Sequence, residues 1–125
     1  MMKIVIDELP PTINKYIGRT NFREYQRDKK RYQQLIRMST IGNNPKFKKC
    51  KIKVIYYFKD KRKHDPSNYD KFLLDGLVEA NIIEDDNYNV IEEFTTIGYV
   101  DYNRPRVEIE IETNWFQKSK RKKWV

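Results

Sequence analysis

The sequence predicts an α/β (α+β) fold, a small mixed β-sheet of about four strands with two main helices, in a single domain spanning residues 1–125. Two patterns carry this prediction. Several short segments alternate apolar and polar residues as half-buried strands do, and two longer segments place apolar residues at helical spacing. A chain of 125 residues suits one compact core, because a second core would have too little apolar surface to close.

The predicted strands are separated by residues that favour turns. Pro10 and Pro11 follow the first strand and force a turn or an extended segment, and Pro105 precedes the last strand. The strands are expected at residues 3–7, 51–58, 90–100 and 106–112. The last of these alternates strictly, with its apolar residues expected to point inward.

Each predicted helix has an apolar stripe. In the first, expected at about residues 20–39, the stripe consists of Phe22, Tyr25, Tyr32, Leu35, Ile36 and Ser39. In the second, which is expected to end near Asn81, it consists of Tyr69, Leu73, Gly76, Leu77 and Ala80. Asn68, Lys71 and Asp75 share the opposite stripe of the second helix.

The charge is positive overall but unevenly distributed. The formal net charge is +8 and the isoelectric point near 9.5, which favours a polyanionic partner. Residues 64–93, however, contain nine acidic residues and one basic residue. Carboxylates repel a phosphate backbone, so this acidic segment would not help a protein that only binds DNA. Bound divalent cations would reconcile the acidic segment with the basic remainder.

Other features narrow the class of protein. Cys50 is the single cysteine, so no intramolecular disulfide can form, which fits a reducing cytosol. No signal peptide or long apolar run is present. We therefore expect a cytoplasmic protein without a membrane partner.

Two aspartates flank the second predicted helix. Phosphodiester hydrolysis needs charge stabilisation at the reacting oxygens, and carboxylates at element ends can hold Mg²⁺ to supply it. Asp65 before this helix and Asp86 after it meet this need. A helix of about 13 residues spans roughly 20 Å. The two carboxylates therefore meet only if the following loop folds back along the helix.

Local pattern alone leaves alternatives open. Asp65 before a proline also fits a helix N-cap, or Ser67 could be the cap with Asp70 closing a capping box. Residues 84–86 also fit a solvated turn. Lys71 and Asp75, four residues apart, also fit a surface ion pair.

The run His64-Asp65-Pro66-Ser67-Asn68-Tyr69-Asp70-Lys71, followed by Glu84-Asp85-Asp86, resembles the signature of the RusA family of Holliday junction resolvases. That family shows an Asp-x-Asp-Asn-x-x-Lys stretch opening a helix and then an Asp-Asp pair. The resemblance implies an endodeoxyribonuclease that resolves four-way junctions in branched DNA by paired symmetric nicks. It also implies a homodimer, whose two-fold symmetry matches that of the junction.

The resemblance implies roles for individual residues. Asp65, Lys71 and Asp86 would be catalytic, with a water activated by the metal as nucleophile and Lys71 stabilising charge on the phosphate. The expected metal ligands are Asp65, Asp86, Asp85, Ser67 and Asp70, holding Mg²⁺ or alternatively Mn²⁺. Asn68 would orient a ligand or the phosphate. No small-molecule cofactor is expected.

Ser67 stands where the family's pattern often has its second carboxylate. A serine brings no negative charge, so the alternative function is a branched-DNA-binding protein that does not cleave. A third hypothesis is an RNA-binding module, because aromatic residues make up 14% of the chain and can stack on bases.

Basic residues are expected to line the DNA face and to make affinity depend on salt. They are Arg23, Arg27, Lys30 and Arg31 of the first helix, Lys61, Arg62 and Lys63 before the second helix, and Lys120 and Arg121 of the C-terminal tail. The tail, residues 118–125, is predicted to be mobile and to add phosphate contacts.

Overall fold

The computed structural model describes residues 1–12, 22–65 and 67–113. The elements are β1 (Met2–Ile6), α1 (Phe22–Ser39), β2 (Cys50–Phe58), α2 (Ser67–Glu79), β3 (Ile91–Val100) and β4 (Arg106–Glu112). The predicted four strands and two helices are confirmed, with small shifts at their ends. Residues 20 and 21, the expected start of the first helix, lie outside the described residues.

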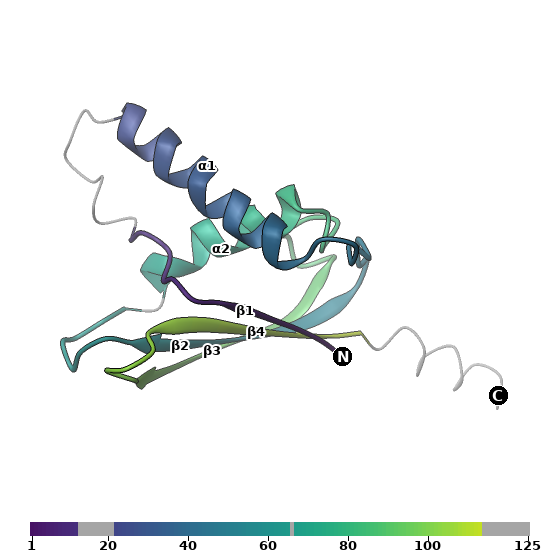
Figure 1. Cartoon of the computed structure of the whole chain (residues 1–125). Helices are drawn as coiled ribbons and strands as arrows, with labels where there is room; N and C mark the ends of the chain where they lie inside the picture. Colours follow the sequence, from purple (N-terminus) through teal and green to yellow (C-terminus); the bar gives the residue numbers. More distant parts are fainter. Residues whose placement is uncertain (13–21, 66, 114–125) are drawn as a thin grey trace, which may run out of the picture.

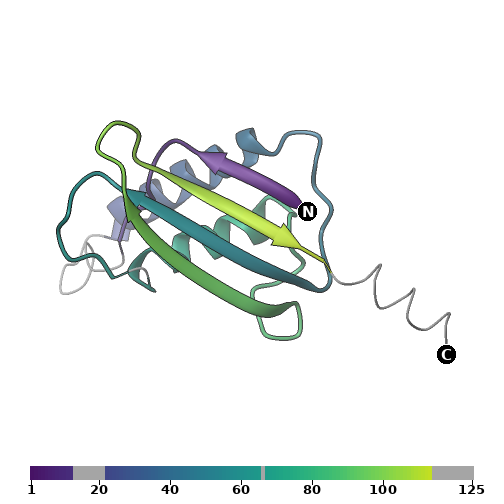
Figure 2. The same cartoon turned by 90° about the horizontal axis from the view of Figure 1, so that it is seen from below.

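The strands form one mixed sheet in the order β1-β4-β2-β3. β4 runs antiparallel to both β1 and β2, whereas β2 and β3 are parallel. A parallel pair needs a crossover connection, and α2 provides it. Both helices lie on the same face of the sheet (Figure 1), and the view from below shows its open face (Figure 2).

The core lies between the sheet and the two helices. In β2, Ile52, Val54, Tyr56 and Phe58 are buried in the core cluster, as their alternation predicted. The α2 stripe is also confirmed, with Leu73 and Leu77 fully buried. Cys50 is buried as well. The helical periodicity and the strand alternation therefore meet in one apolar layer.

The apolar stripe of α1 is only partly confirmed. Tyr32 and Ile36 are buried, but Phe22 is 71% exposed. Phe22 is the first residue of the helix, whereas the buried residues Tyr32 and Ile36 lie in its second half. The helices meet closely at Gly76, where an added Cβ would lie 2.2 Å from Cδ1 of Ile36.

The C-terminus of α2 is closed by Asn81, which has a φ of 59°. The Asn81 amide donates to the Val78 carbonyl and the Ile82 amide to the Leu77 carbonyl, the bonding pattern of a Schellman cap. The chain then turns away from the helix, and Ile83 forms a bridge with Phe47, just before β2. Among the described residues, no helix is both long and apolar enough to cross a bilayer.

Candidate active site

Asp65 and Asp70 lie together at the start of α2. The backbone carbonyl of Asp65 accepts a hydrogen bond from the Asn68 amide at 3.0 Å, in the first turn of the helix. The Tyr56 hydroxyl, from the neighbouring strand β2, donates to Oδ1 of Asp70 at 2.6 Å. This bond ties the first turn of the helix to the centre of the sheet.

The surroundings of Asp70 disfavour its charged form. Burial raises the pKa of the Asp70 carboxyl, and the nearby charge of Asp65 raises it further. Hydrogen bonds from Tyr56 and Thr96 act in the opposite direction but do not cancel the effect of burial. Two carboxylates whose charges repel each other favour a cation between or beside them.

The loop between β2 and α2 is held by His64, to which the sequence assigned no role. Its ring stacks on Phe58 with 4.1 Å between ring centroids and 9° between planes. Nε2 lies 2.9 Å from Oδ1 of Asp60, and Nδ1 lies 3.1 Å from the Tyr69 hydroxyl. With Nε2–H donating to Asp60, Nδ1 accepts from Tyr69. The alternation of residues in β2 predicted that Phe58 points inward. No pattern in the sequence predicted the contacts that the loop makes through His64.

The same loop presents cations beside Asp65. Lys61, Arg62 and Lys63 are all exposed. The Arg62 amide donates to Oδ1 of Asp60, and together with the bond from His64, which has the larger effect, this lowers the pKa of the Asp60 carboxyl. Three exposed cations thus precede Asp65 by two to four residues in the same loop, an arrangement that suits both a phosphate and a cation.

Lys71 makes the surface ion pair that its spacing predicted. Its Nζ lies 3.6 Å from Oδ2 of Asp75, and Lys29 of α1 lies at the same distance from that oxygen. Two lysines therefore share one carboxylate on the exposed side of α2. The three side chains together carry a net positive charge.

Asp85 and Asp86 lie at the opposite end of α2. Oδ1 of Asp85 accepts from the Asp86 amide at 2.7 Å, and Oδ2 accepts from the Asn87 side chain at 3.1 Å, so Asp85 shapes its own turn. Asp86 is exposed. The loop does not make the fold-back along α2 that a shared site in one copy requires, because residues 81–84 hydrogen-bond to residues 46–47, just before the start of β2.

The separation follows from the lengths of the elements. The 13 residues of α2 span about 20 Å, and Asp65 and Asp86 lie beyond its two ends. Within the described residues, no group of three or more acidic, histidine or cysteine side chains is placed to hold a metal ion. Among the described residues of one copy, Asp65 and Asp86 therefore lie at opposite ends of α2 and do not come together in the expected magnesium site.

The predicted DNA-binding cations of the first helix and of the tail have different outcomes. Arg23, Arg27 and Lys30 are exposed on α1. Arg31 instead forms a two-bonded ion pair with Glu8, which raises the pKa of its guanidinium and fastens α1 to the segment after β1. Lys120 and Arg121, the whole tail, and the side chain of Ser67 lie outside what the structure describes.

Comparison with known proteins identifies the family. A search of curated proteins finds no match. The family model for endodeoxyribonuclease RusA matches residues 8–112, a range that contains α1, β2, α2, β3, β4 and the candidate site. The chain therefore belongs to the RusA endodeoxyribonuclease family.

Proposed function

We propose that this protein is a Mg²⁺-dependent, structure-selective endodeoxyribonuclease that resolves four-way DNA junctions as a homodimer by paired symmetric nicks. The observation that carries the proposal is the pairing of Asp65 with Asp70 beside the basic loop 61–63. Carboxylates suit a divalent cation, and the adjacent cations suit the phosphate backbone. Family membership supports DNA hydrolysis at this site.

The separation of the carboxylates in one copy supports a homodimer. Asp65 and Asp70 supply two carboxylates at one end of α2, and Asp86 lies at the other end. A two-fold axis that reverses the direction of α2 would put Asp86 of a second copy at the Asp65 end of the first. Each dimer would then contain two sites, each built from both copies. This matches the two-fold symmetry of the junction.

The remaining residues support binding and orientation. Mg²⁺ held by the carboxylates would stabilise charge at the scissile phosphate. Lys71 adds a cation on the same surface, and Asn68 lies in the first turn of α2, where its amide orients a ligand or the phosphate. Arg23, Arg27 and Lys30 bind phosphates along α1.

A junction-binding protein without nuclease activity is the second candidate. Ser67 motivates it, because a serine at this position brings no charge to the metal. In that case the basic surfaces bind the junction and the carboxylates only shape the loops. Whether the protein cleaves a junction distinguishes the two candidate functions.

The test is incubation of the protein with a synthetic four-way junction in Mg²⁺ or in EDTA. We expect paired nicks that disappear in EDTA. Asp86→Asn should bind the junction at least as tightly as the wild type, because a negative charge is removed, and lose about 100-fold or more of the cleavage rate. Glu84→Gln, an exposed change in the same loop, serves as the control and should cleave normally.

Tight binding without nicks in any divalent ion would assign the protein to the second candidate. Cleavage by Asp86→Asn at the wild-type rate would remove Asp86 from the site.

A further inference from the structure

The strand β3 forms a long, open edge of the sheet. It spans ten residues, and in the described structure it pairs on one side only, with β2. Its register with β2 shifts once near Cys50 and then runs unbroken from Glu93 to Val100. The outer backbone groups of such an edge are a template for another strand.

β3 has a pair of glutamates and a bulge only near its start, and it lacks the lysine and proline that often protect an edge strand. Its sequence contains no lysine, arginine or proline, and its middle consists of Thr95, Thr96 and Ile97, residues that favour strands. The other edge strand, β1, has only five residues and carries Lys3. The two edges of this sheet are therefore not equivalent, and β3 is the one suited to pairing.

We propose that β3 pairs antiparallel with β3 of a second copy about a two-fold axis perpendicular to the sheet, giving one continuous eight-stranded sheet. This proposal rests on the proposed function and names the surface of its dimer. Residues opposite each other in an antiparallel pair lie on the same face, so the axis passes through a residue position. An axis at Thr96 uses the whole length from Glu92 to Val100.

Packing supports this register. It places Phe94 of one copy opposite Gly98 of the other, on the face that carries the helices. Gly98 has no side chain to obstruct the ring, and a Cβ there would already lie 3.2 Å from the Phe58 ring. A large side chain thus faces a small one on both sides of the axis.

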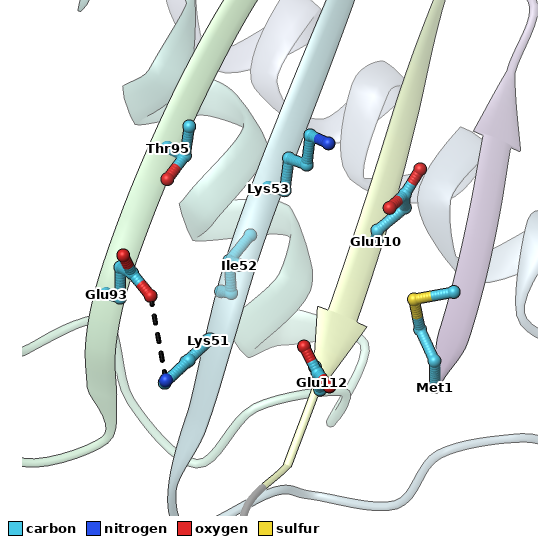
Figure 3. A pocket seen from close by; sticks show the side chains of 8 residues that line it. All are labelled: Met1, Lys51, Ile52, Lys53, Glu93, Thr95, Glu110 and Glu112. Carbon is cyan, nitrogen blue, oxygen red and sulfur yellow. Dashed lines mark ion pairs between the residues drawn. The ribbon is translucent and has the colours of Figure 1, made fainter.

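Charge supports it as well. The same register places Glu92 and Glu93 of the second copy opposite Val100 and Tyr99. That end of β3 borders a hollow lined also by Lys61, by Arg62 and by Asp60, with which Arg62 forms an ion pair. Within its own copy Glu93 forms an ion pair with Lys51 on the open face, at 3.8 Å (Figure 3). The acidic beginning of one β3 therefore meets the basic loop of its partner.

The pairing also has the direction that the shared site needs. Asp86 precedes β3, and Asp65 follows the end of β2 that lies beside the end of β3. Reversing one β3 against the other brings the segment containing Asp86 of the second copy towards the Asp65 end of the first, within the same sheet. Edge pairing and the shared carboxylate site thus follow from one two-fold axis.

The test is the oligomeric state of the full chain measured by sedimentation equilibrium. Thr95→Lys with Ile97→Lys places four lysines around the axis and should weaken dimerisation at least 10-fold. Added lysines do not repel DNA, so a loss of junction cleavage would reflect the lost dimer. Val5→Lys, on the open face of the other edge strand, is the matched control and should remain dimeric. Circular dichroism checks that both variants are folded.

Cross-linking gives a second readout that needs no destabilised dimer. Thr95→Cys should form a covalent dimer with a short bis-maleimide, and Val5→Cys should not. Cys50 does not interfere, because it is buried and burial raises its pKa to about 11.

A folded lysine variant that stays dimeric, or a cross-link through Val5→Cys alone, overturns edge pairing. If the wild type still cleaves junctions in that case, the proposed function survives; cross-linking through Thr95→Cys without cleavage supports edge pairing and removes the proposed function.

Discussion

At the scale of single residues, Asp70 couples the fold to the proposed chemistry. Its carboxyl is half-buried beside Asp65, and both burial and that neighbour raise its pKa. Tyr56 and Thr96 hold it in place from the sheet. The folded protein therefore keeps an electrostatically unfavourable pair of carboxylates at the start of α2, and a divalent cation would relieve the repulsion.

Replacing Asp70 with Asn should stabilise the metal-free protein in a pH-dependent way. The pKa of Asp70 is raised on folding, so the wild type loses stability as the pH rises from the unfolded value of about 3.9 through the folded-state value. Asn keeps an oxygen that accepts from Tyr56 but does not ionise. Thermal unfolding in EDTA should show a higher midpoint for the variant at pH 8 and a shrinking difference towards pH 4. A difference that is constant across this range would contradict the role of ionisation.

At the scale of elements, the contact between α1 and α2 depends on Gly76. An alanine there would favour the helix by about 1 kcal/mol through its propensity alone. Its Cβ, however, would lie 2.2 Å from Cδ1 of Ile36, which is fully buried and cannot move freely. Glycine is therefore needed for the close approach of the helices and not for an unusual φ angle.

Gly76→Ala should lower the free energy of unfolding by about 1–2 kcal/mol, because the free-energy cost of overpacking the core exceeds the gain from the higher helix propensity of alanine. Ile36→Val removes the methyl group that clashes and alone should cost about 1 kcal/mol. The double variant should be clearly more stable than the sum of the two single changes predicts. Urea unfolding of the three variants measures this coupling, and strict additivity would argue against the contact.

The sequence predicted the elements more completely than the site. Alternation in β2 and the stripe of α2 depend on local periodicity, and both are confirmed. The sequence left open whether the loop after α2 folds back towards Asp65, and its path is set by Asn81 and by the bridge between Phe47 and Ile83. The pairing of Glu8 with Arg31 is likewise a long-range contact. Contacts between segments distant in the sequence leave no periodic signal.

At the scale of the whole molecule, the acidic segment is divided by its own fold. Residues 64–93 hold nine acidic residues, but α2 places Asp65 and Asp70 at one end and Asp85 and Asp86 at the other. In one copy these are two separate acidic ends. In a two-fold dimer that reverses α2, the Asp65 end of each copy would lie beside the Asp86 end of the other. Each of these two places would then contain more ligands for a cation than one copy supplies.

Mixing two inactive variants distinguishes shared sites from sites within one copy. Asp65→Asn and Asp86→Asn should each abolish cleavage as homodimers. In a mixed dimer, the intact Asp86 of the first variant meets the intact Asp65 of the second, so one of the two sites is complete. Unfolding and refolding an equal mixture should give about half mixed dimers, if pairing is random, with one working site each. We therefore expect about a quarter of the wild-type nicking rate, as single nicks and not paired ones, on a labelled four-way junction. Because a dimer whose sites lie within single copies would have both sites damaged, a mixture without activity would place Asp65 and Asp86 in the same copy's site or in none.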